Sequence, residues 1–159
     1  MFLKPDYNLE SIYDIDIEQL VNKKIKTLFF DLDSTLMKSK TGKFSFKTLQ
    51  FLNDLKTNFI IAIVTNNKNL DYIKKAQSQI DVPIYYRAKK PDTLVLLNAC
   101  KDLGVSPKNC AFIGDRPLSD ILVGVRCSMT TILVDSISKD EENCIIRFAR
   151  FLERLTISK

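Results

Sequence analysis

The sequence predicts an α/β protein with a doubly wound, Rossmann-like sheet of five parallel strands. Short apolar runs, of the kind found in strands buried on both faces, alternate with segments whose apolar residues have helical spacing. Polar or charged residues follow most of these runs directly, as at the carboxyl edge of an open sheet. At 159 residues, residues 1–159 fit a single domain.

The first predicted strand lies in residues 25–36, IKTLFFDLDSTL, where an apolar run stops abruptly at acidic residues. Side chains alternate along an extended segment, so Asp31 and Asp33 share one face. Residues 1–24 form an N-terminal helical segment, in which we expect a helix that begins near Asn8 as its cap and packs against the sheet. A helix that lies on a membrane is the alternative for this segment.

The remaining predicted elements alternate between strand and helix. Four further strands are expected, at residues 59–64, 82–86, 110–113 and 130–134. Helices are expected at residues 45–56, 70–79, 91–103, 120–126 and 141–156. Pro91 fits the first turn of its helix, Gly104 fits the position after that helix, and Asp140 fits the cap of the last helix.

The C-terminal helix, within residues 140–157, is amphipathic. Its apolar positions recur at spacings of three and four: Ile145, Phe148, Leu152 and Leu155. Arginines occupy another stripe: Arg147, Arg150 and Arg154. We expect the apolar stripe to pack on the core, and a face that binds a membrane or a partner is the alternative.

The composition excludes several classes of site. The chain has no histidine, and its four cysteines include no C-x-x-C pair, which excludes a zinc site and Ser-His or Cys-His catalysis. We expect reduced thiols in a reducing compartment, and therefore a cytoplasmic protein. No signal peptide or membrane span is expected, because the longest apolar run, residues 59–64, is far too short to cross a bilayer.

A lysine-rich loop, residues 37–46 with the sequence MKSKTGKFSF, follows the first strand. Its lysines, Lys38, Lys40 and Lys43, are interleaved with Met and Phe and with no acid. Charge runs are usually only solvated, but this loop should rim the crevice beside the carboxylates. Together with the net charge of +5, it would suit an anionic or lipidic substrate and a peripheral membrane contact.

In a parallel sheet, the polar groups that follow the strands converge on one edge. They are Asp31, Asp33, Thr65, Asn66, Lys89, Lys90, Asp115 and Asp120. Such a set indicates phosphoryl transfer with a hard metal such as Mg²⁺. Asp31 and Asp115, with a backbone carbonyl near Asp33, would bind the metal, and a carboxylate would attack phosphorus. Asp33 would then act as acid and base, while Thr65 and a lysine would hold the phosphate oxygens.

Four stretches of the sequence resemble the four motifs of the haloacid dehalogenase superfamily of aspartate-nucleophile phosphatases. They are FFDLDSTL, IVTNN, AKKP and FIGDRPLSD. Three further stretches look, more narrowly, like the YqeG branch of subclass IIIA. They are SIYDIDIEQL, YYRAKKP, and GDRPLSD with TTILVD after it. That branch includes mitochondrial phosphatidylglycerophosphatases. The resemblance covers residues 3–137 and leaves the last helix outside it.

The resemblance implies a role for each matching residue. It makes Asp31 the nucleophile and Asp33 the general acid and base. Thr65, Asn66 and Lys90 become the phosphate-binding residues, and Lys90 is preferred over Lys89 because the motif lysine directly precedes the proline. The implied cofactor is Mg²⁺, with these metal-binding residues: Asp31, Asp33, Asp115 and Asp120.

The resemblance implies a capless phosphatase, since the segment between Leu36 and Thr65 has room for only one helix. It implies a Mg²⁺-dependent phosphomonoesterase that forms an aspartyl-phosphate and converts phosphatidylglycerophosphate to phosphatidylglycerol. The alternatives are a phosphatase of a soluble or nucleic-acid-end phosphate, and a regulatory or binding module. The sequence carries no nucleic-acid motif and does not determine the oligomeric state.

Overall fold

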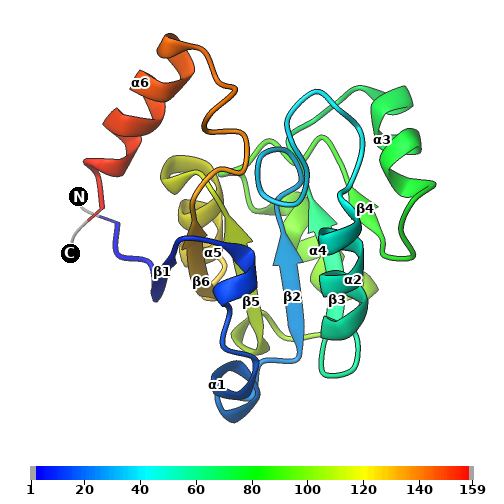
Figure 1. The fold of residues 1–159 in the computed structure, drawn as a ribbon. Coiled ribbons are helices and arrows are strands. Elements are labelled where there is room, and N and C mark those ends of the chain that lie inside the picture. The colour runs from blue at the N-terminus through cyan, green and yellow to red at the C-terminus, as the bar shows by residue number, and fades with distance from the viewer. Residues whose placement is uncertain (1–2, 158–159) are drawn as a thin grey trace.

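The computed structural model describes residues 3–157, and its centre is a parallel sheet of six strands in the order β1-β6-β5-β2-β3-β4 (Figure 1). The strands are β1 (Tyr7–Leu9), β2 (Thr27–Phe30), β3 (Ile60–Val64), β4 (Ile84–Tyr85), β5 (Cys110–Gly114) and β6 (Thr130–Val134). Every pairing is parallel. The predicted α/β class is confirmed, and the sheet has one strand more than the five expected.

The helices lie in the expected order along the chain. They are α1 (Ile17–Asn22), α2 (Phe46–Leu55), α3 (Leu70–Gln77), α4 (Leu94–Asp102), α5 (Leu122–Arg126) and α6 (Cys144–Arg154). Shorter turns add the 3₁₀ segments η1 (Ile12–Asp14) and η2 (Pro107–Asn109) and the π-helical η3 (Pro117–Ile121). None of these helices in residues 3–157 is long and apolar enough to cross a bilayer.

The helix that we expected to begin near Asn8 begins later, as α1 at Ile17, and the extra strand β1 forms ahead of it. Asn8 lies in β1 and pairs in parallel with Leu133 of β6. The Asp6 carboxylate accepts hydrogen bonds from the backbone N–H of Thr131 at 2.8 Å and from its hydroxyl at 3.0 Å, which ties β1 to β6. The prediction was wrong because this pairing involves residues more than a hundred positions apart.

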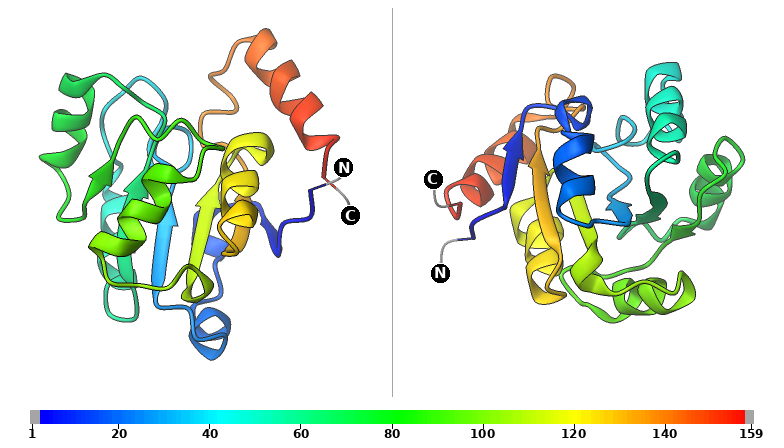
Figure 2. Two further views of the ribbon diagram at one scale, coloured as in Figure 1. Left: turned by 180° about the vertical axis from the view of Figure 1, so that it is seen from behind. Right: turned by 90° about the horizontal axis from the view of Figure 1, so that it is seen from below.

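Helices cover both faces of the sheet (Figure 2), and the core forms two apolar layers, one on each face. Side chains of the central strands alternate between them, so Phe30 and Ile113 enter one layer while Phe29 and Phe112 enter the other. Helices α1, α2 and α3 contribute to the first layer, and α4 and α5 to the second. This double covering fixes the strands, and their carboxyl ends form one rigid edge.

Two predicted helix starts were wrong. Pro91 lies in the turn ahead of α4, where the backbone N–H of Asp92 donates to the Lys89 carbonyl at 2.9 Å. The cap of α6 is Asn143, whose side chain accepts from the N–H of Ile146 at 3.0 Å, and Asp140 lies in the preceding turn. A local sequence pattern cannot choose between neighbouring polar residues as the cap.

Helix α6 stands off the sheet, and its apolar stripe does not pack on the core (Figure 1). No residue of α6 is buried, and Ile145 is 80% exposed. Two arginines of the other stripe, Arg150 and Arg154, face the protein instead, since they bind carboxylates of the body. The expected core packing was therefore wrong, because ion pairs rather than apolar contacts orient this helix.

Candidate active site

A cavity of about 710 Å³ opens at the carboxyl edge of the sheet. Its lining includes all but one of the predicted site residues: Asp31, Asp33, Thr65, Asn66, Lys90 and Asp120. Asp115, the remaining one, is buried beside it and belongs to the same acidic cluster. The parallel sheet therefore brings together residues that follow β2, β3, β4 and β5, as their positions after the strand ends predict.

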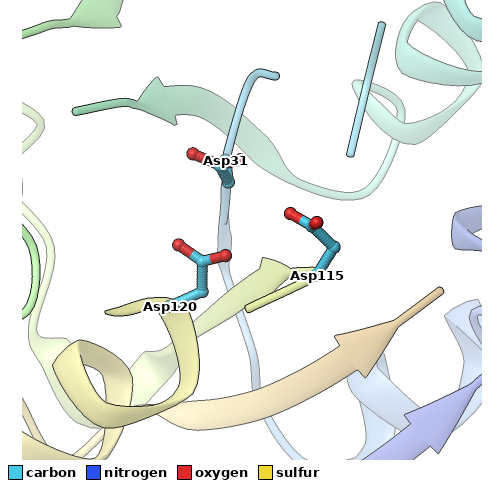
Figure 3. A group of neighbouring side chains, drawn as sticks. All are labelled: Asp31, Asp115 and Asp120. Carbon is cyan, nitrogen blue, oxygen red and sulfur yellow. The ribbon is translucent and has the colours of Figure 1, made fainter. Parts of the chain in front are cut away.

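Three buried carboxylates form the centre of the site (Figure 3). One oxygen each of Asp31, Asp115 and Asp120 lies within 4.8 Å of the others. Burial, together with the neighbouring carboxylates, raises the pKa of Asp31 to about 8, although Lys90 opposes this shift. Burial and Asp120 likewise raise the pKa of Asp115 to about 6. Such concentrated negative charge on oxygen ligands fits a hard divalent cation.

Gly114, the last residue of β5, makes room for this cluster. A Cβ at this position would lie 2.4 Å from the carboxyl carbon and one oxygen of Asp120. The Asp120 carboxylate turns back over Gly114 and accepts a hydrogen bond from the backbone N–H of Arg116 at 3.0 Å. Only glycine allows this approach, which explains the Gly-Asp pair at the end of the strand.

Lys90 is the lysine that enters the site. Its Nζ lies 2.6 Å from Asp31 and 2.7 Å from Asp120, whereas Lys89 is exposed. Burial disfavours the charged amine, but the carboxylates of Asp120 and Asp31 more than offset this, so the pKa of Lys90 is raised. The cation therefore stays charged and compensates part of the acidic cluster.

The Asn66 side chain holds the backbone of Lys90. Its Oδ1 accepts from the Lys90 N–H at 2.6 Å, and its Nδ2 donates to the Lys90 carbonyl at 3.0 Å. Both polar groups of the amide are thus bound to the chain. The predicted contact between this amide and phosphate stays a prediction, while the geometry makes Asn66 a positioning residue for Lys90.

Thr65 directly follows β3, is buried, and lines the cavity. Its backbone N–H donates to the Tyr85 carbonyl at 2.9 Å, and its Oγ1 accepts from the N–H of Asn67 at 3.1 Å. Since the hydroxyl accepts in that bond, its own proton can be donated into the cavity.

Asp33 lies apart from the acidic cluster. Asn67 Nδ2 donates to its carboxylate at 3.1 Å, and the Tyr72 hydroxyl donates to the other oxygen. Burial and the adjacent Asp33 raise the pKa of Tyr72, so this hydroxyl remains a donor. The two donors fix the carboxylate at the rim, two positions beyond Asp31.

Sequence reasoning missed several residues that touch this site. Arg150 of α6 forms ion pairs with Asp115 and with Glu142, the latter at 2.8 Å. The Thr35 hydroxyl donates to Asp115 at 3.0 Å. Thr35 could have been found from its place beside the first motif, as could Asn67 beside the second. Nothing local to Arg150 or Tyr72 indicated that they reach the site, because helix orientation decides this.

A family described as HAD-hydrolase-like matches residues 87–153. The chain is 28% identical over 157 residues to the probable phosphatase YqeG of Bacillus subtilis (strain 168), covering 99% of this chain and 91% of that protein. It is also 28% identical over 162 residues to phosphatidylglycerophosphate phosphatase 1, chloroplastic/mitochondrial, of Arabidopsis thaliana. That match covers 96% of this chain and 46% of the plant protein.

Both comparisons relate the chain to the haloacid dehalogenase superfamily. The similarity to its relatives supports a phosphoric monoester hydrolase. The similarity also extends further than the motifs indicated. We expected it to end near residue 137, whereas the family match continues to residue 153, through most of α6.

Solved structures of haloacid dehalogenase-type proteins share the fold of this chain. A HAD phosphatase from Thermococcus onnurineus superposes with a TM-score of 0.59 at 14% identity, covering 75% of this chain and 89% of that one. A HAD family enzyme from Bacteroides thetaiotaomicron, solved as a magnesium complex, gives a TM-score of 0.54 at 15% identity. That alignment covers 79% of this chain and 98% of the other.

Proposed function

We propose that this phosphatase is a Mg²⁺-dependent phosphomonoesterase that forms an aspartyl-phosphate on Asp31, with phosphatidylglycerophosphate as its substrate. The observation that carries the proposal is the contact of Lys90 with both Asp31 and Asp120 inside a buried acidic cluster. This arrangement supports three roles within one cavity: a nucleophilic carboxylate, a cation that binds phosphate, and oxygen ligands for a metal.

Asp31 starts the proposed reaction. One of its carboxylate oxygens attacks phosphorus, and the bond between phosphorus and the ester oxygen breaks as the new P–O bond forms. Asp33 gives its proton to the departing alkoxide. Tyr72 and Asn67 keep the Asp33 carboxyl in place for this transfer, since both donate to it.

The second step returns the enzyme to its starting state. Asp33 removes a proton from a water molecule, whose oxygen attacks the phosphorus of the aspartyl-phosphate. The bond between phosphorus and the Asp31 oxygen breaks, and inorganic phosphate leaves. Asp31 is a carboxylate again, and Asp33 is protonated for the next cycle.

Lys90 and Thr65 hold the non-bridging phosphate oxygens in both steps. Lys90 also lowers the repulsion between an anionic substrate and the carboxylates. When bound, Mg²⁺ supplies further charge neutralisation at these oxygens. The carboxylates that would hold the metal ion are those of Asp31, Asp115 and Asp120. We propose that Asp33 adds one more ligand, through either its backbone carbonyl or its side chain.

The proposed lipid substrate is supported by the named activity of the Arabidopsis relative and by the open cavity. Between β2 and β3 the chain forms a single helix, α2, so the cavity is accessible to a large molecule. Lys40 lines its rim, in the lysine-rich loop. Because its four cysteines are free, we propose that the enzyme acts in a reducing compartment, the cytoplasm. We also propose that it makes peripheral contact with a membrane.

The test is phosphate release from phosphatidylglycerophosphate in mixed micelles with Mg²⁺, compared with para-nitrophenyl phosphate. Asp31→Asn, which removes the nucleophile without changing its shape, should lower turnover of both compounds by about 10³-fold or more. Asp81→Asn, a change at an exposed carboxylate, is the matched control and should be fully active.

The outcomes separate the candidate functions. Much faster turnover of the lipid supports the full proposal. Turnover of only the soluble compound would retain the chemistry and refute the lipid substrate, in favour of a soluble or nucleic-acid-end phosphate. No turnover of either would favour a regulatory module, and a largely active Asp31→Asn variant would refute the nucleophile.

A further inference from the structure

Helix α6 is attached to the protein through its polar side. Arg150 binds Asp115 and Glu142, and Arg154 binds Asp135 at 2.6 Å. Glu153 pairs with Arg116. These contacts leave the opposite side of the helix facing away from the sheet (Figure 1).

The outward side of α6 is an apolar face of large side chains. They are Ile145, Phe148, Phe151, Leu152 and Leu155, with exposed fractions of 80%, 61%, 58%, 47% and 57%. Single exposed apolar residues are ordinary, but five on one helix form a contiguous patch. Exposing such a patch to water is unfavourable, which indicates a surface that is covered when the protein acts.

We infer that this apolar face docks on a bilayer that contains anionic phospholipid. The inference deepens the proposed function and rests on it for the lipid substrate. A helix with a strongly apolar side and arginines on the other lies in the plane of a bilayer interface, with its apolar side about 5–10 Å deep.

The charges next to this face fit an anionic surface. Three acids close to α6 are neutralised within the protein: Glu141 by Lys38, Glu142 by Arg150 and Asp135 by Arg154. Asp140, in the turn ahead of the helix, has no cationic partner among the ion pairs of the described residues. Among residues 3–157, Arg147 of α6 and Lys40 at the cavity rim have no carboxylate partner within an ion-pair distance. With a net charge of +5, the protein would be attracted to anionic headgroups.

The apolar face also adjoins the active-site cavity. The inner side of the same helix lines that cavity, through Asn143, Ile146, Arg150 and Glu153. A helix is about 10 Å across, so docking of α6 would bring the cavity within one helix diameter of the headgroups. The phosphate of a lipid would then reach the cavity while its acyl chains stay in the bilayer.

A second copy of the chain fits this face less well. A helix of 11 residues is roughly 16 Å long and about 10 Å wide. A stable interface needs roughly 800 Å² of accessible surface per partner, so a dimer through this face would need contacts beyond the single helix. A bilayer has no such minimum area, because its affinity grows with each inserted side chain.

The test uses the absence of tryptophan from the natural sequence. Phe148→Trp places one fluorophore on the apolar face, and Leu94→Trp places one on α4, at a similarly exposed site. Vesicles of phosphatidylcholine with about a third phosphatidylglycerol should shift the emission of Trp at position 148 to the blue and leave that of Trp at position 94 unchanged. No shift at position 148 would overturn the inference.

Co-sedimentation with the same vesicles gives a second measurement. Phe148→Ser/Leu152→Ser should weaken binding at least about tenfold, which corresponds to about 1.4 kcal/mol, whereas Leu94→Ser/Leu97→Ser should bind like the natural protein. Equal binding of all three proteins would refute the inference. So would sedimentation showing a dimer of the natural protein that the Phe148→Ser/Leu152→Ser variant loses, since the face would then bind a second copy.

Para-nitrophenyl phosphate turnover separates this inference from the proposed function. Neither pair of substitutions touches the cavity, so both variants should hydrolyse this soluble compound at the natural rate. Natural protein that binds vesicles but hydrolyses no phosphate ester would refute the proposed function and leave the docking surface intact. Natural protein that hydrolyses the ester but binds no vesicles would refute the docking surface and leave the proposed function intact.

Discussion

Arg150 of α6 is ion-paired with Asp115 at the carboxyl end of β5, although the two residues are 35 positions apart. Asp115 also belongs to the acidic cluster that we propose as the metal site. The guanidinium and a metal cation therefore use the same carboxylate. This pair connects the site to the helix that carries the exposed apolar face.

Removal of the guanidinium should strengthen metal binding. Arg150→Gln is expected to raise the affinity for Mg²⁺ about tenfold, because a positive charge next to a metal ligand repels the cation. Isothermal titration calorimetry at pH 8.5 measures this affinity. That pH is chosen because Arg150 also lowers the pKa of Asp115, and a pH well above 6 keeps this carboxyl ionised in the natural protein.

The control for this change is Arg154→Gln, which breaks the ion pair with Asp135 on the same helix. It should leave the affinity for Mg²⁺ unchanged. Equal or weaker binding by Arg150→Gln would show that the arginine does not compete with the metal.

Tyr72 should affect turnover through Asp33. Tyr72→Phe removes the hydroxyl that donates to the Asp33 carboxylate and leaves Asn67 as the remaining donor. We expect kcat for para-nitrophenyl phosphate to fall about tenfold with little change in KM, because the proton-transfer group is misplaced while the phosphate contacts remain. Tyr86→Phe, at an exposed tyrosine, is the control. A rise in KM alone would instead assign Tyr72 to substrate binding.

The buried Asp31 should make the metal-free protein less stable as the pH rises. Its pKa is about 8 in the folded protein, against an ordinary value of 3.8. Between about pH 4 and pH 8 the unfolded chain has released this proton while the folded protein still binds it, so rising pH favours unfolding. Lys90 is protonated in both states throughout this window and adds no slope.

Thermal unfolding of the metal-free protein between pH 5 and pH 8 measures this effect. Asp31→Asn, which cannot ionise, should have the flatter profile and a Tm advantage that grows towards pH 8. Mg²⁺ should raise the Tm of the natural protein most at pH 8, where the carboxylates are ionised. Parallel profiles for the two proteins would contradict the raised pKa.

The glycines at positions 114 and 104 should respond differently to alanine. Gly114→Ala forces a Cβ against the Asp120 carboxyl, so we expect a loss of about 2–3 kcal/mol in unfolding free energy and a severe loss of activity. Gly104 has a φ of +65° and open space around it, so Gly104→Ala should lose only about 1–2 kcal/mol with activity retained. Urea denaturation and phosphate release measure both. Full activity of Gly114→Ala would refute a role for the placement of Asp120.

Local sequence patterns were sufficient to predict the central strands of the sheet. The apolar runs that became β2, β3, β5 and β6 are buried on both faces, and such a run has few alternatives to a central parallel strand. Because parallel strands share one carboxyl edge, the residues that follow them could be grouped before their contacts were known. Asp31, Thr65, Lys90 and Asp120 line one cavity for this reason.

The sequence by itself therefore determined the α/β class, the strand ends that form the site and the acids that gather there. Tertiary structure decided that residues 7–9 form β1, that Asn66 holds the backbone of Lys90, and that Tyr72 and Arg150 reach the site. It also decided which side of α6 faces the protein. These features depend on contacts between distant residues, and helical periodicity shows that a helix has two sides without showing which of them is buried.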